Sequence, residues 1–334
     1  MQVYFDADAD LALIRSRRVA LIGYGNQGRA QALNLRDSGV SVTVGLPEGS
    51  ASRARVAADG FDVMTAAEAS AQADVAVMLA PDEDQGRIYA EAVAPTLRQD
   101  GALFFAHGLN IRFRLIEPRP DLDVLLVAPK GPGTALRSEY EKGSGLIALF
   151  AVEQDASGEA QALALSYATA IGSGRAGILS TTFAEECEAD LFNEQAVLWG
   201  AIPELIHAGF ETLVDAGFSP EISYLECLTE VKLIADLIYE RGIAGMREAI
   251  SNTAEFGALK GGTRIVDADT RTEMRRILRE VRSGSFVEEL LQDARDGYPR
   301  LTASREAAAR HPLEAVRSRI EGLRPPVRGS RQNP

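Results

Sequence analysis

The sequence predicts an α/β domain built on a parallel sheet, followed by a domain composed almost entirely of helices. Two observations support this fold class. Between residues 19 and 152, short apolar runs alternate with amphipathic stretches of helical period, which is typical of a parallel sheet with helices on both faces. From Phe183 to Arg282, long segments with apolar residues at helical spacing follow one another, with few strand signals.

Six apolar runs are expected to form buried strands, and they cover residues 19–23, 40–45, 75–79, 103–106, 124–128 and 146–152. Helical patterns fall between strands, as at residues 28–38 and 85–97. In the second domain, the segments 191–216 and 222–241 predict long helices. The residues Gly-Phe-Ser-Pro at 217–220 mark the break between them.

These patterns predict three regions of the chain. Residues 1–182 form the α/β domain, and residues 183–323 form the helical domain. The tail at residues 324–334 is polar and rich in proline, and we expect it to be disordered.

Composition excludes several classes of protein. The 334 residues carry a formal charge of −13 and no basic cluster dense enough to follow phosphates, so we expect no nucleic-acid partner. The two cysteines provide no disulfide framework, which fits a reducing compartment. No apolar run approaches the ~20 residues of a membrane span, and the first residues lack a signal pattern. We therefore expect a cytoplasmic protein that does not associate with membranes.

A glycine turn follows the first predicted strand and opens a helix. In such a turn, Gly23 allows the tight bend, Gly25 lets the backbone approach a pyrophosphate, and Gly28 lets helix and strand pack closely. The strand–turn–helix context distinguishes this motif from a chance match. The turn predicts a dinucleotide site, to which the remaining residues of the motif also belong: Tyr24, Asn26 and Gln27.

The loop after the second predicted strand is where such domains select between NADP(H) and NAD(H). A 2′-phosphate could be held by hydroxyl and guanidinium groups in this loop, whereas Glu48 could instead accept a hydrogen bond from a ribose 2′-hydroxyl and repel the phosphate. Both signals are present, so the choice of cofactor stays open. The groups that favour the phosphate belong to Ser50, Ser52, Arg53 and Arg55.

Four carboxylates stand out in the helical domain. Asp190 and Glu194 are four residues apart, and so are Glu226 and Glu230, so each pair places two oxygen ligands on one helix face. Both segments are otherwise strongly apolar, and like charges in an apolar setting repel and are costly to desolvate. Hard cations such as Mg²⁺ prefer oxygen ligands of this kind. One such pair usually lies on a solvent-exposed helix face. Two pairs in apolar helices make a metal site as well supported as that ordinary explanation.

The ordered motifs together resemble the ketol-acid reductoisomerase family in its short-chain form. The similarity runs from residue 3 to about residue 323. It includes Gly23-Tyr-Gly-Asn-Gln-Gly28, Ala80-Pro-Asp-Glu83, Phe105-Ala-His-Gly108, Ala128-Pro-Lys-Gly-Pro-Gly133, Asp190-Leu-Phe-Asn-Glu-Gln-Ala-Val197, Glu226-Cys-Leu and Ser251-Asn-Thr-Ala-Glu-Phe-Gly257.

The resemblance implies a Rossmann-type dinucleotide-binding domain followed by an all-α knotted C-terminal domain. It implies a reaction in two steps on a 2-aceto-2-hydroxy acid, either 2-acetolactate or 2-aceto-2-hydroxybutyrate, as in valine and isoleucine biosynthesis. An alkyl group migrates with the help of two Mg²⁺ ions, and NADPH, with NADH as the open alternative, then reduces the product to a 2,3-dihydroxy acid.

The resemblance also assigns roles to residues at matching positions. Asp190 would bridge the two Mg²⁺ ions and Glu194 would bind one of them, whereas Glu226 and Glu230 would come from the partner subunit. Glu230 would also act as an acid/base. Lys130 would supply positive charge or a proton, and Ser251 would hold the substrate carboxylate.

His107 matches the family's histidine at the end of a sheet strand. A lone histidine is more often structural, yet the position of His107 at a strand's C-terminal end favours a role in the site. The matching positions expected to contact the cofactor are Asp82, Gln85, His107 and Gly133.

Several positions depart from the family. Asn26 replaces a serine, Arg29, Thr134 and Thr229 replace histidines, and Trp199 stands where the family usually has a small residue, often cysteine. Trp199 could project near the substrate and reshape its pocket, or it could pack against a shifted neighbour. These changes motivate a second hypothesis, a relative that only reduces a related 2-keto acid or an imine. A non-catalytic scaffold is a third, which the intact set of acids opposes.

Assembly follows from the apolar character of the helical domain. Its surplus apolar faces need burial, and a homodimer with shared active sites would provide it. Whether such dimers build larger oligomers stays open.

Overall fold

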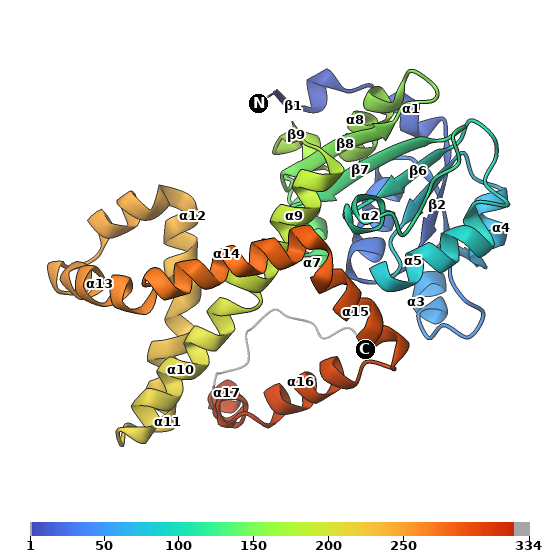
Figure 1. Cartoon of the computed structure of the whole chain (residues 1–334). Coiled ribbons are helices and arrows are strands. Elements are labelled where there is room, and N and C mark those ends of the chain that lie inside the picture. The colour runs from blue at the N-terminus through green and yellow to red at the C-terminus, as the bar shows by residue number, and fades with distance from the viewer. Residues whose placement is uncertain (1, 324–334) are drawn as a thin grey trace. The chain divides into compact units, whose positions relative to one another are not determined.

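The computed structural model describes residues 2–323, and the tail predicted to be disordered lies outside them (Figure 1). The chain divides into two compact units, one from the N-terminus to Ala189 and the other from Asp190 onward. The change of unit falls within helix α9 (Phe183–Asn193). The domain boundary near residue 182 and the knot stay predictions.

The first unit is built on a sheet of nine strands, counted over the described residues, in the order β1-β9-β8-β7-β6-β5-β2-β3-β4. The strands are β1 (Val3–Tyr4), β2 (Arg18–Ile22), β3 (Ser41–Gly45), β4 (Asp62–Met64), β5 (Val75–Met78), β6 (Ala102–Phe105), β7 (Asp123–Pro129), β8 (Ala148–Gln154) and β9 (Ile178–Ser180).

The predicted α/β class is confirmed, but the sheet is mixed and not parallel throughout. The six neighbouring strands β4, β3, β2, β5, β6 and β7 are all parallel to one another. Strand β8 runs antiparallel to β7, and β1 runs antiparallel to β9. After β7 the chain forms helix α7 (Gly133–Glu141), which packs against α2 (Asn26–Asp37) instead of crossing the sheet. Strand β8 therefore begins at the same end of the sheet where β7 stops, and it runs in the opposite direction. Apolar runs indicate burial but not direction, so the sequence pattern could not show this reversal.

Both faces of the central strands are buried. Val19 and Leu21 of β2 belong to the core on one face, and Ala20 and Ile22 belong to the core on the other. The helices that complete this unit are α1 (Leu11–Arg15), α2, α3 (Arg53–Ala58), α4 (Ala66–Ala71), α5 (Asp82–Ile88), α6 (Leu109–Arg112), α7 and α8 (Ala160–Ala170), with a π-helical turn η2 (Tyr89–Val93) and short 3₁₀ turns η1 (Asp6–Asp8) and η3 (Ser173–Arg175).

The second unit is helical throughout its described residues. After α9 it comprises η4 (Glu194–Leu198), α10 (Ala201–Asp215), α11 (Pro220–Tyr224), η5 (Leu225–Thr229), α12 (Glu230–Ala249), α13 (Asn252–Ile265), α14 (Ala268–Ser283), α15 (Ser285–Arg295), α16 (Pro299–Arg310) and α17 (Pro312–Leu323).

The predicted break between α10 and α11 is present. Gly217 has a φ of 92°, which favours glycine, and Ser219 caps α11 ahead of Pro220. Phe210 of α10 and Leu313 of α17 are buried in a small apolar core behind this break. Within residues 2–323, none of the helices combines the length and the apolar character that a membrane crossing requires.

Candidate active site

The glycine turn joins β2 to α2 at the C-terminal edge of the sheet. Gly23 has a φ of 116°, and a Cβ there would lie 2.4 Å from the carbonyl oxygen of Leu79. A Cβ on Gly28 would lie 2.6 Å from the Gly23 carbonyl oxygen, so helix and turn pack closely. Gly25 faces open space, with no described neighbour within 4 Å of the place its Cβ would take. This open side, next to the N-terminus of α2, fits an anionic pyrophosphate.

Two cavities adjoin the turn. One of about 600 Å³ lies between the turn and the segments after β3 and β5. Another of about 340 Å³ is bounded by Asn26 and Gly133, among others. Gln27 lies behind the turn, where its side-chain amide donates to the Gly131 carbonyl 2.9 Å away. The predicted cofactor residues that line the larger cavity are Gly23, Tyr24, Gly25, Ser50 and Ser52.

The loop after β3 presents its charged residues unequally. Glu48 is exposed at the tip of the loop. Arg53 is half-buried, and its guanidinium donates to the carbonyl oxygens of Leu46, Val63 and Met64 at 3.0 to 3.3 Å. This side chain therefore ties the start of α3 to the ends of β3 and β4.

Asp82 and Gln85 shape the segment after β5. Gln85 is buried, and its amide donates to the Ala80 carbonyl at 2.8 Å and to Asp82 Oδ1 at 3.0 Å. Asn110 donates to the Asp82 carbonyl at 3.0 Å. These bonds hold the wall of the cavity opposite the glycine turn.

A buried carboxylate, Glu186, brings two predicted catalytic residues together. Its Oε1 accepts from Lys130 Nζ at 2.9 Å, and its Oε2 lies 3.2 Å from His107 Nδ1. Oε2 also accepts from the Gly108 backbone N–H at 2.8 Å. Glu186 is not among the residues predicted from the sequence, although it lies one helical turn before Asp190, and this spacing is a signal that could have found it.

The electrostatics of this cluster favour its charged forms. Burial lowers the pKa of His107, but hydrogen bonds with Cys187 and Glu186 and the charge of Glu186 raise that pKa well above its usual value. Burial also raises the pKa of Glu186, and the interactions with His107 and Lys130 outweigh it, so the net shift is downward. The cluster therefore holds a carboxylate between two cationic groups.

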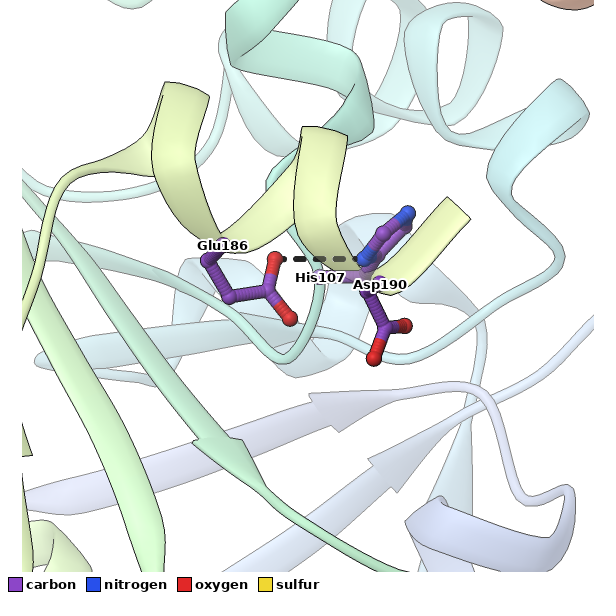
Figure 2. Close-up of side chains that lie close together, drawn as sticks. All are labelled: His107, Glu186 and Asp190. Atoms are coloured by element: carbon purple, nitrogen blue, oxygen red, sulfur yellow. Dashed lines mark ion pairs between the residues drawn. The ribbon is translucent and has the colours of Figure 1, made fainter. Parts of the chain in front are cut away.

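His107, Glu186 and Asp190 also form the group of possible metal ligands found among the described residues (Figure 2). One ligand atom from each lies within 4.8 Å of the others. The two acids come from successive turns of α9, and His107 follows β6. Buried and half-buried carboxylate oxygens of this kind fit a hard cation such as Mg²⁺.

The predicted acid pairs both adjoin π-helical turns. Glu194 begins η4, and its carbonyl accepts from the backbone N–H groups of Trp199 and Gly200. Glu226 lies within η5, and Glu230 follows it at the start of α12. Such bulges widen a helix locally and recur at functional sites, which the four-residue spacing did not reveal.

Asp190 and Glu194 are half-buried, but Glu226 and Glu230 are exposed within the described chain. Neither of the latter two joins the ligand group around His107. Ser251 caps α13 by accepting from the Ala254 N–H at 3.2 Å.

Comparison with protein families gives matches over most of the chain. Residues 13–177 match the NADPH-binding domain of acetohydroxy acid isomeroreductase. Residues 183–326 match the C-terminal domain of ketol-acid reductoisomerase.

Among solved structures, the chain is similar to an NADH-preferring ketol-acid reductoisomerase from an uncultured archean. The two are 42% identical over 97% of this chain and 99% of that one, with a TM-score of 0.94. Two other structures share only the fold. A semialdehyde dehydrogenase NAD-binding protein from Cupriavidus necator is 18% identical over 80% of this chain and 99% of its own, with a TM-score of 0.61. An oxidoreductase from a Jannaschia species is 14% identical over 80% of this chain and 97% of its own, with a TM-score of 0.60.

Proposed function

This chain belongs to the ketol-acid reductoisomerase family, and from that premise we propose the course of its reaction and the residues that carry it. It is an NAD(P)H-dependent oxidoreductase. The proposed substrate is a 2-aceto-2-hydroxy acid, which undergoes a Mg²⁺-dependent alkyl migration and then a reduction. The observation that carries this proposal is the Lys130–Glu186–His107 cluster next to Asp190.

Asp190 and Glu194 would hold Mg²⁺ in one subunit, with Glu226 and Glu230 completing the site from a partner. When bound, the two ions would supply the positive charge that the substrate's oxygens need as the alkyl group moves. The exposed state of Glu226 and Glu230 in a single chain supports their use by a second chain.

The neighbouring side chains would control protons and orientation. Glu186 holds the Lys130 ammonium group at 2.9 Å, so its positive charge stays at a defined place. The raised pKa of His107 keeps a proton on its imidazole near neutral pH. Glu230 would exchange a proton with the substrate hydroxyl, and Ser251 would orient the substrate carboxylate.

The glycine turn would bind the dinucleotide, which supplies the hydride when bound. Among the two forms, the contacts of the loop after β3 favour NADH. Arg53 is engaged by three backbone carbonyls, which opposes its use as a phosphate ligand, and Glu48 is exposed where it would repel a 2′-phosphate. Ser50, Ser52 and Arg55 remain as the groups that could bind that phosphate.

A homodimer would bury the apolar side chains that α12 and α13 expose. Leu233, Tyr239, Phe256 and Leu259 each expose more than 60% of their surface in the single chain. This exposure, on the same helices that carry Glu230 and follow Ser251, supports a dimer with shared sites. A cytoplasmic location goes with this proposal.

A reductase without isomerase activity is the alternative, and Trp199 is the observation that favours it. Trp199 is 66% exposed, and its backbone N–H donates to the carbonyl of Glu194, a proposed metal ligand, at 2.9 Å. A side chain of this size, close in sequence to a proposed metal ligand, would reshape any pocket that it entered and so change which substrate binds.

One assay separates the two functions. The protein is incubated with 2-acetolactate, Mg²⁺ and NADH or NADPH, and nicotinamide oxidation is followed; a parallel reaction contains the rearranged 2-keto-3-hydroxy acid. Turnover of both substrates, with Mg²⁺ required for the first, is expected. Turnover of the rearranged acid alone would leave only the reductase.

A further inference from the structure

Arg29, which departs from the family just after the glycine turn, lines the smaller cavity and also makes a contact away from the Lys130–Glu186–His107 cluster. Its guanidinium forms two hydrogen bonds with the carboxylate of Asp59, Nε to Oδ2 at 2.6 Å and Nη2 to Oδ1 at 2.8 Å. The same Oδ2 accepts from the phenol of Tyr24 at 2.9 Å. Three segments meet at this carboxylate: the glycine turn, the first turn of α2, and the residue that ends α3.

This three-residue contact is built into the fold. The Asp59 carboxylate is 15% exposed and Tyr24 is 2% exposed, so the bond between them is partly shielded from water, whereas the Arg29 side chain is 47% exposed. The hydrogen bonds from Arg29 lower the pKa of Asp59, and burial together with the bond to Asp59 raises that of Tyr24. Asp59 is therefore a carboxylate at neutral pH, and Tyr24 keeps the proton that it donates.

Helix α3 is consequently held at both ends. At its start, Arg53 binds the carbonyls at the ends of β3 and β4, and at its end Asp59 binds the glycine turn and α2. Arg36, two turns further along α2, adds a bond to the Asp59 carbonyl at 2.6 Å. The loop that would face the ribose, residues 47–52, lies directly before α3, so its distance from the glycine turn depends on these contacts.

We propose that Tyr24, Arg29 and Asp59 form a positioning brace that sets the separation of the glycine turn and the ribose loop, and so the affinity for the dinucleotide. The brace rests on the dinucleotide binding proposed above. It acts through the backbone of the two cofactor-binding segments and does not touch the reacting atoms. It should therefore change the dissociation constant of the cofactor while leaving kcat at saturating cofactor nearly unchanged.

The test measures dinucleotide binding by titration calorimetry on the full chain, with NADH and NADPH in separate runs. Arg29→Ala and Asp59→Asn should each raise Kd by roughly threefold to fivefold, as expected for a charge-assisted contact that solvent partly screens. Because both act through one contact, the double variant should be no weaker than the worse single variant. Arg29→Lys, which keeps one ion pair, should recover part of the affinity. Arg98→Ala, which breaks an arginine–aspartate pair with Asp74 at the N-terminal ends of β2 and β5, is the matched control and should bind as the wild type does.

Two results would overturn the brace. In the first, the losses of affinity in the two single variants add fully in the double variant, and Arg29→Ala weakens binding in a salt-dependent manner even when Asp59 is already asparagine. This result would mean that Arg29 contacts a cofactor phosphate directly. Unchanged Kd in the folded Asp59→Asn variant would mean that the contact does not position the loop. Failure of the wild-type protein to bind either dinucleotide would instead contradict the proposed function, so the two failures are distinguishable.

Discussion

At the scale of single residues, Glu186 and Glu48 use their charges in different ways. Glu186 is enclosed and holds two cations in place, so its charge is balanced inside the protein. Glu48 is exposed, and its charge acts on whatever approaches the loop. Removing the Glu186 charge should therefore change a different property of the enzyme from removing the Glu48 charge.

Glu186→Gln should lower turnover of 2-acetolactate by roughly a hundredfold, because Lys130 and His107 lose the anion that orients them and holds their charge. Dinucleotide Kd should stay the same. The measurement is kcat beside a binding titration. Glu188→Gln is the matched control, since Glu188 lies on the same helix and pairs with Arg112 at 2.9 Å. Equal losses in both variants would argue against a role for Glu186 in the site.

Glu48→Ser should shift the kcat/KM ratio toward NADPH by roughly tenfold, because it removes like-charge repulsion of the 2′-phosphate. Steady-state rates with each dinucleotide measure this shift. Glu83→Ser, which removes an acid from the first turn of α5, is the control. An unchanged ratio in Glu48→Ser would show that this carboxylate points away from the ribose.

At the scale of elements, Asp74 joins the start of β2 to the segments before β5 and β6. It accepts from the Arg18 backbone N–H at 2.9 Å and pairs with Arg98 at 2.8 Å. Burial raises the pKa of Asp74, but the hydrogen bonds from Arg18 and Arg98 outweigh it and lower that pKa from 3.8 to about 2. The carboxylate is 11% exposed, so solvent screens these contacts only weakly.

Asp74 should therefore make stability depend on pH. Because the pKa of Asp74 is lower in the folded state than in the unfolded state, its carboxylate stabilises the fold by about 2 kcal/mol at any pH above the unfolded-state pKa. This contribution is lost as the pH falls from about 4 through about 2. Asp74→Asn should be less stable at pH 7 and should lose less on acidification. Urea unfolding between pH 7 and pH 3 measures both. If the free energy of unfolding changed with pH in the same way in the wild type and in Asp74→Asn, Asp74 would not be the source of the pH dependence. Asp84→Asn, which removes an exposed carboxylate, is the control.

At the scale of the whole molecule, the central expectation is a site completed by a second chain. Asp190→Asn and Glu226→Gln should each abolish isomerisation and weaken the Mg²⁺ requirement, because each removes a charged oxygen ligand. When the two inactive variants are unfolded, mixed and refolded together, about a quarter of the sites should regain all their ligands. Recovered activity near this fraction supports sharing between subunits. No recovery, with the wild type refolding normally, would place all four acids in one chain.

Much of the fold and part of the site could be read from the residues alone. Apolar periodicity and the glycine turn are local signals, so the α/β class, six of the nine described strands and the break before Ser219 followed from them, whereas the short strands β1, β4 and β9 did not. The sequence by itself also determined the family. Tertiary packing decided three things: the direction of β8, the position of Glu186 between Lys130 and His107, and the contact of Arg29 with Asp59. Each depends on residues that are far apart in the chain and meet only when the sheet and its helices pack, and no local pattern records such a meeting.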